Sequence, residues 1–122
     1  MKWLILAVVL VTSAPALAEP QSSSATVTGY VIDSACVFSK NLDKPRSREC
    51  ALSCAKAGSP LVILADDGTI YLPISDEMPA TGQNARLMKF AGEKVTARGR
   101  VFEHGGSHAL VIEEINAVSV TK

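Results

Sequence analysis

The sequence predicts a mainly β protein: a small five-stranded barrel with a helical insertion after the first strand and a short helix between the third and fourth strands. Two observations support this fold class. Five short segments are either continuously apolar or alternate between apolar and polar residues, and turn-forming residues separate them. The chain has 122 residues, of which 48% are hydrophobic and 20% charged, and this composition is typical of one small globular domain.

The N-terminal segment has the pattern of a secretory signal peptide. Lys2 precedes an apolar run over residues 3–11, and Ala16-Leu17-Ala18 follows as an A-x-A cleavage sequence. The apolar run is far shorter than the roughly 20 residues that a membrane-spanning helix needs. We therefore predict that residues 1–18 are removed and that the protein is periplasmic or secreted, with no membrane attachment after cleavage.

The predicted domain covers residues 25–122 and follows a flexible leader at residues 19–24. Its first strand covers residues 25–33, because apolar and polar positions alternate there. Gly29 lies inside this strand and predicts either a bulge or the close approach of another backbone. The polar stretch at residues 34–45 predicts a loop.

Residues 46–57 are the best helix candidate and would form most of the insertion after the first strand. Pro45 fits the first turn of such a helix. Gly58, followed by Pro60, is a typical end of a helix.

Two apolar runs, residues 61–65 and 69–74, surround Asp66-Asp67-Gly68. Glycine supplies the positive φ that a tight turn needs, so this pattern predicts a hairpin. We interpret the two aspartates as turn residues rather than as calcium ligands. Pro73 places the end of the second of these strands at a sheet edge or a break.

The last third of the chain predicts a loop at residues 75–83 and a short helix at residues 84–91. Residues 93–103 alternate strictly between apolar and polar positions, which is typical of a strand with one buried face. Gly105-Gly106 predicts a tight turn, and residues 108–118 return as the last strand.

This order of elements matches the OB-type barrel, in which a helix separates the third and fourth of five strands. Parts of the chain also resemble small secreted bacterial OB-fold proteins with a three-cysteine insertion. The similar parts are the motif D-x-x-C…C-A-x-x-C-A…G from Asp33 to Gly58, the motif D-G-x-I-Y-L, and the segments AGEKVTARGRV and ALVIEEI. The resemblance covers roughly residues 25–118 and implies an exported OB-like fold without implying an activity.

The three cysteines are the residues most able to bind a ligand or to react. Cys50 and Cys54 are four residues apart, so a helix places them on one face with their sulfurs close together. Cys36 follows the first strand, and a folded insertion brings it to the same place. Three converging thiols allow three interpretations: a disulfide with a spare thiol, a metal site, or thiol redox chemistry.

Export to an oxidising compartment favours the disulfide. A bond from Cys36 to Cys50 or Cys54 closes a loop of about 15 residues, worth about 3 kcal/mol in the chain-entropy model. A Cys50–Cys54 bond within one helical turn is strained, because the two side chains point in the same direction. The third thiol then remains to be explained.

A metal site uses all three thiols. Three thiolates form a trigonal Cu(I) site or three corners of a tetrahedral zinc site. Asp33, three residues before Cys36, is a candidate fourth ligand, as are His104 and His108. A two-residue turn would put the two histidines on opposite faces of the sheet, so we expect them to be solvated rather than to share a metal.

Thiol redox chemistry has a weaker basis. Cys50 lies in the first turn of its predicted helix, near Arg46 and Arg48, and both a helix N-terminus and cations lower a thiol pKa. A nucleophilic Cys50 resolved by Cys54 or Cys36 would make a small oxidoreductase. Neither a C-x-x-C motif nor a thioredoxin-like order of strands and helices supports this interpretation.

The charged residues disfavour nucleic acid as a partner, because 12 basic residues balance 12 acidic ones. Lys94, Arg98 and Arg100 form a basic stripe on one strand, which we interpret as a solvated strand face. Alternation sends Glu113 and Glu114 to opposite faces of their strand, so we do not expect them to act as an acid–base pair.

We therefore predict an exported, non-enzymatic binding module in which Cys36, Cys50 and Cys54, with Asp33, hold a soft metal ion such as copper or zinc. The alternative is a structural or envelope-stress protein in which one disulfide staples the insertion and the partner is an unidentified envelope protein. A small thiol redox protein is the second alternative.

Overall fold

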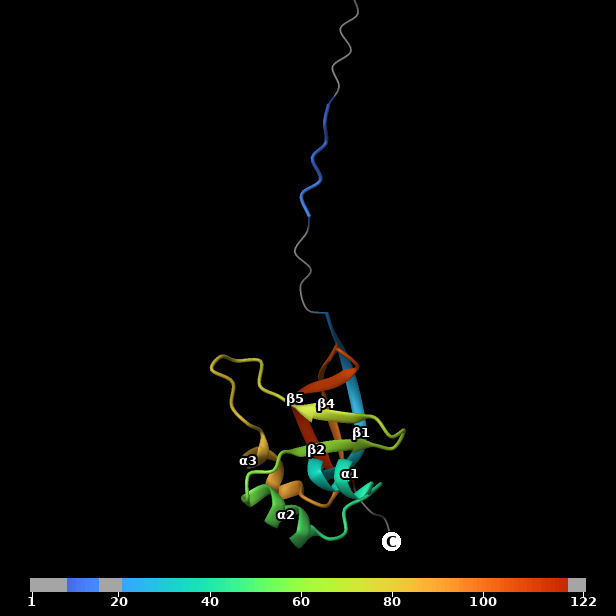
Figure 1. Ribbon diagram of the computed structural model, residues 1–122, viewed down its shortest axis with the longest axis vertical. Helices are drawn as coiled ribbons and strands as arrows, with labels where there is room; N and C mark the ends of the chain where they lie inside the picture. The colour runs from blue at the N-terminus through green and yellow to red at the C-terminus, as the bar shows by residue number, and fades with distance from the viewer. Residues whose placement is uncertain (1–8, 16–20, 119–122) are drawn as a thin grey trace, which may run out of the picture.

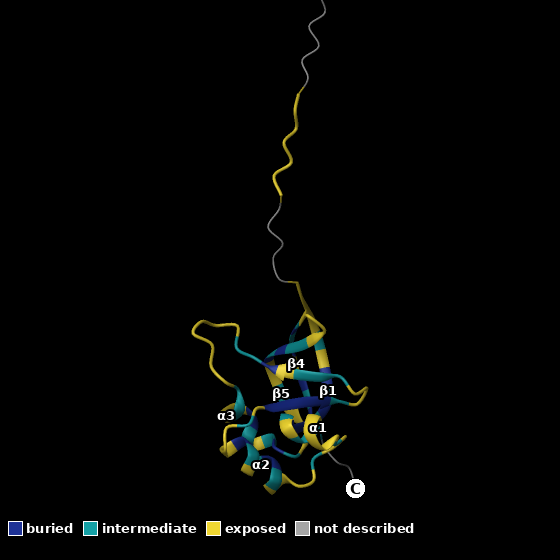
Figure 2. Ribbon diagram, viewed as in Figure 1, coloured by how far each residue is buried: buried dark blue, intermediate teal, exposed yellow. Residues whose placement is uncertain are grey.

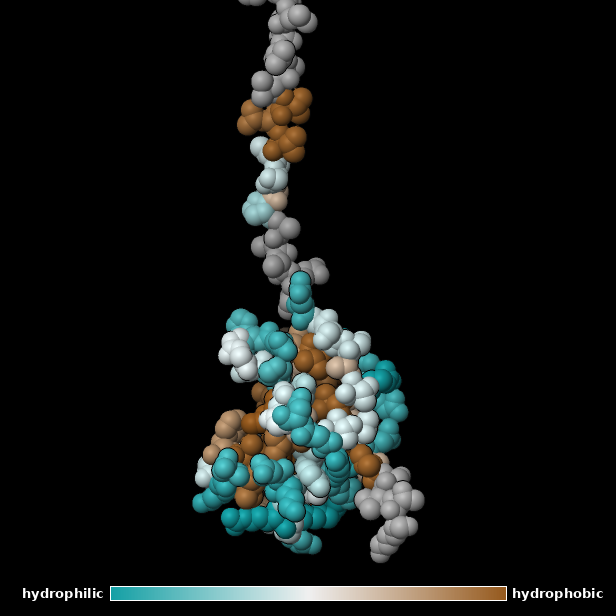
Figure 3. Space-filling model, turned by 90° about the vertical axis from the view of Figure 1, so that its right-hand side faces the viewer, coloured by the Kyte–Doolittle hydropathy of each residue, from teal (hydrophilic) through white to brown (hydrophobic). Residues whose placement is uncertain are grey.

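The computed structural model describes residues 9–15 and 21–118. Residues 9–15 have no regular secondary structure, and the apolar side chains of Val9, Leu10 and Val11 are exposed (Figure 3). The predicted cleavage site and the start of the predicted leader lie outside the described residues. Within the described part of the chain, no helix has the length and apolar character needed to cross a membrane.

Five strands form a closed barrel in the order β1-β2-β3-β5-β4, with β4 pairing back to β1 (Figure 1). All neighbouring strands are antiparallel except β3 and β5, which are parallel. This closed five-stranded architecture confirms the predicted small OB-like barrel. The strands are β1 (Ser22–Asp33), β2 (Leu61–Ala65), β3 (Ile70–Pro73), β4 (Lys94–His104) and β5 (Ser107–Ala117).

The first strand begins earlier than the sequence predicts. β1 starts at Ser22 rather than at residue 25, because residues 22–24 pair with residues 100–102 of β4. These serines therefore extend the barrel instead of forming a flexible leader. Gly29 is the predicted site of close approach: a Cβ atom there would overlap the carbonyl oxygen of Leu64 on β2.

The described residues form three α-helices, α1 (Ser34–Lys40), α2 (Arg48–Lys56) and α3 (Asn84–Leu87), and a 3-10 turn, η1 (Met88–Phe90), follows α3. The prediction of a loop at residues 34–45 is wrong for its first half, which is α1. The α2 helix begins at Arg48, and Ser47 rather than Pro45 defines its start. The predicted helix end is confirmed, since Gly58 adopts a φ of 102° just after the last turn.

Both predicted tight turns are confirmed by their backbone angles. Gly68 has a φ of 90°, and the Oδ1 atom of Asp67 accepts a 2.9 Å hydrogen bond from the Thr69 N–H. The turn between β4 and β5 contains Gly105 and Gly106, with φ angles of 58° and 81°. Glycine permits these left-handed conformations without the steric cost of a side chain.

The apolar core has two parts, one on each face of β2. Both faces of this strand are therefore apolar. The main cluster fills the barrel and includes Val31 and Ile63, together with residues of α2 and α3. A second cluster lies on the outer face of β1 and β2 and consists of Ile32, Val62 and Leu64, against which Val37 of α1 packs. Figure 2 shows β2 mainly in dark blue, as a buried strand, next to α1, whose residues are intermediate or exposed.

The prediction that Glu113 and Glu114 lie on opposite faces is wrong. The register between β4 and β5 shifts at Arg98/Gly99, so Glu113 is an extra residue in a bulge. Both carboxylates are exposed and both contact Arg98, at 3.0 Å from Glu114 and 3.5 Å from Glu113. Lys94 and Arg100 are also paired with carboxylates, those of Asp66 and Asp76 respectively.

Candidate metal centre

Cys36 and Cys50 occupy the same position in two different helices. Each is the third residue of its helix, and each donates its backbone N–H to the residue that caps the helix. The Cys36 N–H lies 3.1 Å from Oδ2 of Asp33, and the Cys50 N–H lies 3.0 Å from Oγ of Ser47. These hydrogen bonds fix the starts of α1 and α2, so the two cysteine backbones are held in place.

The packing of the two helices brings the third cysteine into the same cluster. Ala51 and Ala55 of α2 are buried in the main core, and Cys50 and Cys54 precede them directly in the chain. The cysteines therefore lie beside the buried face of α2. Cys36 packs against the second apolar cluster on the outside of the barrel.

The three sulfur atoms lie within 4.8 Å of one another, which confirms the predicted convergence. All three side chains are half-buried, and none forms a disulfide in this structure. Metal–sulfur bonds of about 2.3 Å around one ion place the sulfurs about 4 Å apart. Small rotations of the side chains are therefore enough to bring the three sulfurs to bonding distance of one ion.

Asp33 lies next to this cluster, at the end of β1, where only 1% of its surface is exposed. Its Oδ2 atom caps α1, but its Oδ1 atom is buried without a hydrogen-bond partner. A buried oxygen left unpaired costs about 1–3 kcal/mol, and more when it is charged. Its carboxylate does not belong to the group of mutually close donor atoms, which consists of the three sulfurs.

Burial and neighbouring negative charge disfavour the thiolate forms in the absence of a cation. Burial raises the pKa of Cys36, and the charges of Asp33 and the other two cysteines raise it further. Burial likewise raises the pKa of Cys54, followed by the charges of Asp33 and Cys50. A bound cation would offset this negative charge and replace the thiol protons.

The structure does not bring the other predicted ligands into the cluster. His104 pairs with Ser107 across the two-residue turn, as predicted. His108 is partly buried rather than solvated: its Nε2 atom lies 3.1 Å from Oε1 of Glu103, and its ring packs edge-on against Tyr71. Neither histidine belongs to the group of close donor atoms.

The predicted activation of Cys50 by Arg48 lacks structural support. The Arg48 guanidinium donates hydrogen bonds to the Lys89 carbonyl oxygen at 3.2 Å and to Oε1 of Glu93 at 3.1 Å. The charge of Arg48 is therefore paired with that of Glu93, the residue that precedes β4.

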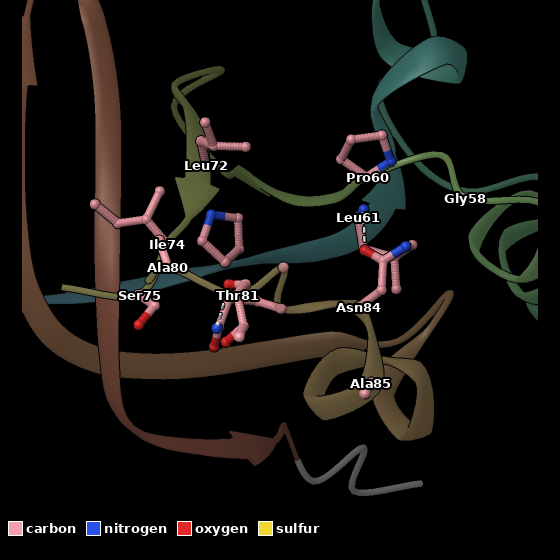
Figure 4. A pocket seen from close by; sticks show the side chains of 13 residues that line it. Gly58, Pro60, Leu61, Leu72, Ile74, Ser75, Ala80, Thr81, Asn84 and Ala85 are labelled. Atoms are coloured by element: carbon pink, nitrogen blue, oxygen red, sulfur yellow. Dashed lines mark hydrogen bonds between the residues drawn. The ribbon is translucent and has the colours of Figure 1, made fainter. Parts of the chain in front are cut away.

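Sequence analysis missed two apolar grooves, of about 590 and 690 Å³, which meet at Pro60 and Leu72. Figure 4 shows the first, where Asn84 projects between Pro60 and Ala85 and accepts a hydrogen bond from the Leu61 N–H at 2.9 Å. The described residues that line this first groove include no Cys, His, Asp or Glu. No sequence pattern indicates these grooves, because the ends of distant elements form them.

Comparisons with protein-family models, with curated proteins and with solved structures found no significant match. The fold and the cysteine cluster are therefore the basis for classifying this protein. It is a small OB-like barrel that carries a three-cysteine cluster, suited to binding a metal, on the helical insertion between β1 and β2.

Proposed function

We propose that this protein is an exported, non-enzymatic module that binds one soft metal ion through Cys36, Cys50 and Cys54. The observation that carries the proposal is the convergence of the three sulfurs to within 4.8 Å of one another from two separately capped helices. Thiolates are the ligands that Cu(I) and zinc favour in proteins. The signal-peptide pattern at residues 1–18 supports export.

The composition of the cluster favours Cu(I), since three sulfurs complete a trigonal site for this ion. Zinc requires a fourth ligand. The unpaired Oδ1 atom of Asp33 is the candidate for that position, because it is buried and its charge acts on both Cys36 and Cys54. Cu(I) is therefore the first ion to test and zinc the second.

A binding role also agrees with the state of the thiols. Their raised pKa values keep Cys36 and Cys54 protonated at neutral pH when no metal is bound, and a protonated thiol is a poor nucleophile. This observation disfavours Cys36 and Cys54 as the nucleophile of a small thiol oxidoreductase. The partner of the module would be the metal ion itself, or an envelope protein that supplies or receives it.

The test is metal binding by reduced protein that has been exported with its own N-terminal segment. Native mass spectrometry after addition of Cu(I), and separately of Zn²⁺, should show one ion per chain. Replacing any one of the three cysteines by serine should weaken binding on the order of 100-fold, because each supplies a direct ligand. Ser53→Ala, at an exposed position of α2, is the matched control and should bind like the wild type.

Two results would contradict the proposal. One is the absence of bound ion in the reduced wild-type protein at ion concentrations that saturate ordinary thiolate sites. The other is unchanged affinity in all three serine variants. Freshly exported protein with a stable disulfide and no metal would instead support the structural alternative, in which one disulfide cross-links the insertion between β1 and β2.

A further inference from the structure

We infer that the metal site is controlled by oxidation: a disulfide between Cys36 of α1 and one cysteine of α2, and a bound metal ion, are mutually exclusive states of the cluster. The inference rests on the proposed metal-binding function and adds a mechanism of release. It follows from the number of donors, their placement on two helices and their accessibility.

The placement of the sulfurs limits which pair oxidises. Cys50 and Cys54 share one helix, and Cα–Cβ bonds on a helix tilt in the same direction, which is unfavourable for a disulfide. Cys36 comes from the other helix, and its sulfur lies within 4.8 Å of both of the others. The disulfide therefore joins Cys36 of α1 to one of the two cysteines of α2.

The number of donors makes the two states exclusive. Only three sulfurs belong to the group of close donor atoms in the described residues. A disulfide consumes two of them and leaves one cysteine of α2 as a single thiolate, which does not retain an ion by itself. All three cysteines are half-buried, so a small oxidant has access to them.

Hydrogen peroxide is the oxidant class that we assign to the step. The sulfur of one cysteine attacks the peroxide O–O bond, forms a sulfenic acid and releases water after protonation. The sulfur of the second cysteine then attacks the sulfenic sulfur, forms the S–S bond and releases a second water. Two electrons pass from the two sulfurs to peroxide, the metal keeps its oxidation state, and the remaining cysteine takes up a proton as the ion leaves.

The two helices pack on different parts of the core, so the disulfide would join segments that are otherwise anchored separately. Cys36 and Val37 of α1 pack on the second cluster, whereas Ala51 and Ala55 of α2 belong to the main cluster. Residues 41–47 connect the helices and are largely exposed. Oxidation should therefore make this connection more resistant to proteolysis.

The experiment uses Cd²⁺, a soft ion that peroxide does not oxidise, bound to the reduced full-length protein. Ultraviolet absorption of the cadmium–thiolate bonds reports occupancy. Addition of peroxide should release the whole bound equivalent of Cd²⁺ and lower the protein mass by two hydrogen atoms. Peptide mapping should place the disulfide between Cys36 and either Cys50 or Cys54, and reduction with a phosphine should restore Cd²⁺ binding.

Matched variants separate this inference from the proposed function. Cys50→Ser and Cys54→Ser should each still form a disulfide to Cys36, whereas Cys36→Ser should form no disulfide between the helices. If the reduced wild type binds Cd²⁺ but peroxide gives sulfinic acid, a disulfide between two chains or a Cys50–Cys54 bond, the inference is overturned and the proposed function stands. If the reduced protein binds neither Cd²⁺, Cu(I) nor Zn²⁺, the proposed function fails first.

Discussion

The single residue Asp33 has two roles, as the cap of α1 and as a negative charge beside the thiols. Its Oδ2 atom caps α1, and its charge contributes to the raised pKa of both Cys36 and Cys54. The carboxylate is almost fully buried, and its Oδ1 atom has no hydrogen-bond partner. A cation held by the three sulfurs would lie close to this charge and reduce its cost.

Asp33→Asn tests the electrostatic role without removing the cap, because asparagine caps helices about as well as aspartate. A carboxylate next to a thiol disfavours the thiolate and raises the thiol pKa; removing the charge should therefore lower the pKa of Cys36 and Cys54. Burial still keeps both above the ordinary value. Alkylation rates measured against pH on the metal-free protein should show both transitions moving to lower pH.

Asp43→Asn is the charge control for this prediction, since Asp43 is an exposed carboxylate in the connection between the helices. It should leave both transitions where they are. Equal shifts in the two variants would show that general charge, rather than the buried Asp33 carboxylate, sets the thiol pKa.

At the scale of elements, the insertion is held by polar contacts at the ends of α2. Ser47 caps the first turn, and Asn84 of α3 binds the other end: its Nδ2 atom donates to the carbonyl oxygens of Ser59 at 2.8 Å and Ala55 at 3.3 Å. The same side chain accepts a hydrogen bond from Leu61 at the start of β2. These contacts fix the position of Cys50 and Cys54 relative to the barrel.

Ser47→Ala removes the cap of α2 and should lower the free energy of unfolding by about 1 kcal/mol. Urea unfolding of the metal-free protein measures this loss. Ser53→Ala is again the matched control, because Ser53 is exposed inside the same helix and alanine has the higher helix propensity. A loss of similar size in Ser53→Ala would show that the Ser47 cap is not the cause.

At the scale of the whole molecule, close backbone contacts at glycines allow the barrel to close. β1 passes near β2 at Gly29, and β4 passes near β5 at Gly99, beside the bulge at Glu113. A Cβ atom at Gly99 would overlap the carbonyl oxygen of Val111 and lie 3.2 Å from the backbone nitrogen of Glu113. Backbone atoms cannot rotate away as a side chain does, so the strands themselves would have to move.

Gly99→Ala should therefore lower the free energy of unfolding by about 3 kcal/mol, at the upper end of ordinary overpacking costs. Thermal unfolding compared with the wild type measures the effect. Gly82→Ala provides the control, because a Cβ atom there meets nothing within 4 Å. A Gly99→Ala protein as stable as Gly82→Ala would mean that the contact between β4 and β5 is looser than described.

The alternation of apolar and polar residues along a strand predicts which side chains are buried only where the barrel has no bulge. Residues 93–103 alternate regularly, and β4 follows that pattern in its burial. Glu113 and Glu114 depart from alternation because a bulge adds one residue to β5, and no local pattern marks it. The α1 helix was missed for a similar reason: its seven residues are too few for a helical period, and a cap and an outer apolar surface stabilise it.

Residue patterns alone predict the five strands, the glycine turns, the helix that carries Cys50 and Cys54, and the meeting of three thiols. Periodicity, turn chemistry and the four-residue spacing of these cysteines are local properties, so they can be recognised directly in the sequence. Three-dimensional packing was needed to show that the Cys36 sulfur lies close to those of α2, that Asp33 lies beside the sulfurs rather than within their group, and that both histidines lie outside it. Those facts depend on how α1 and α2 pack against two separate apolar clusters, and such packing joins residues that no local pattern connects.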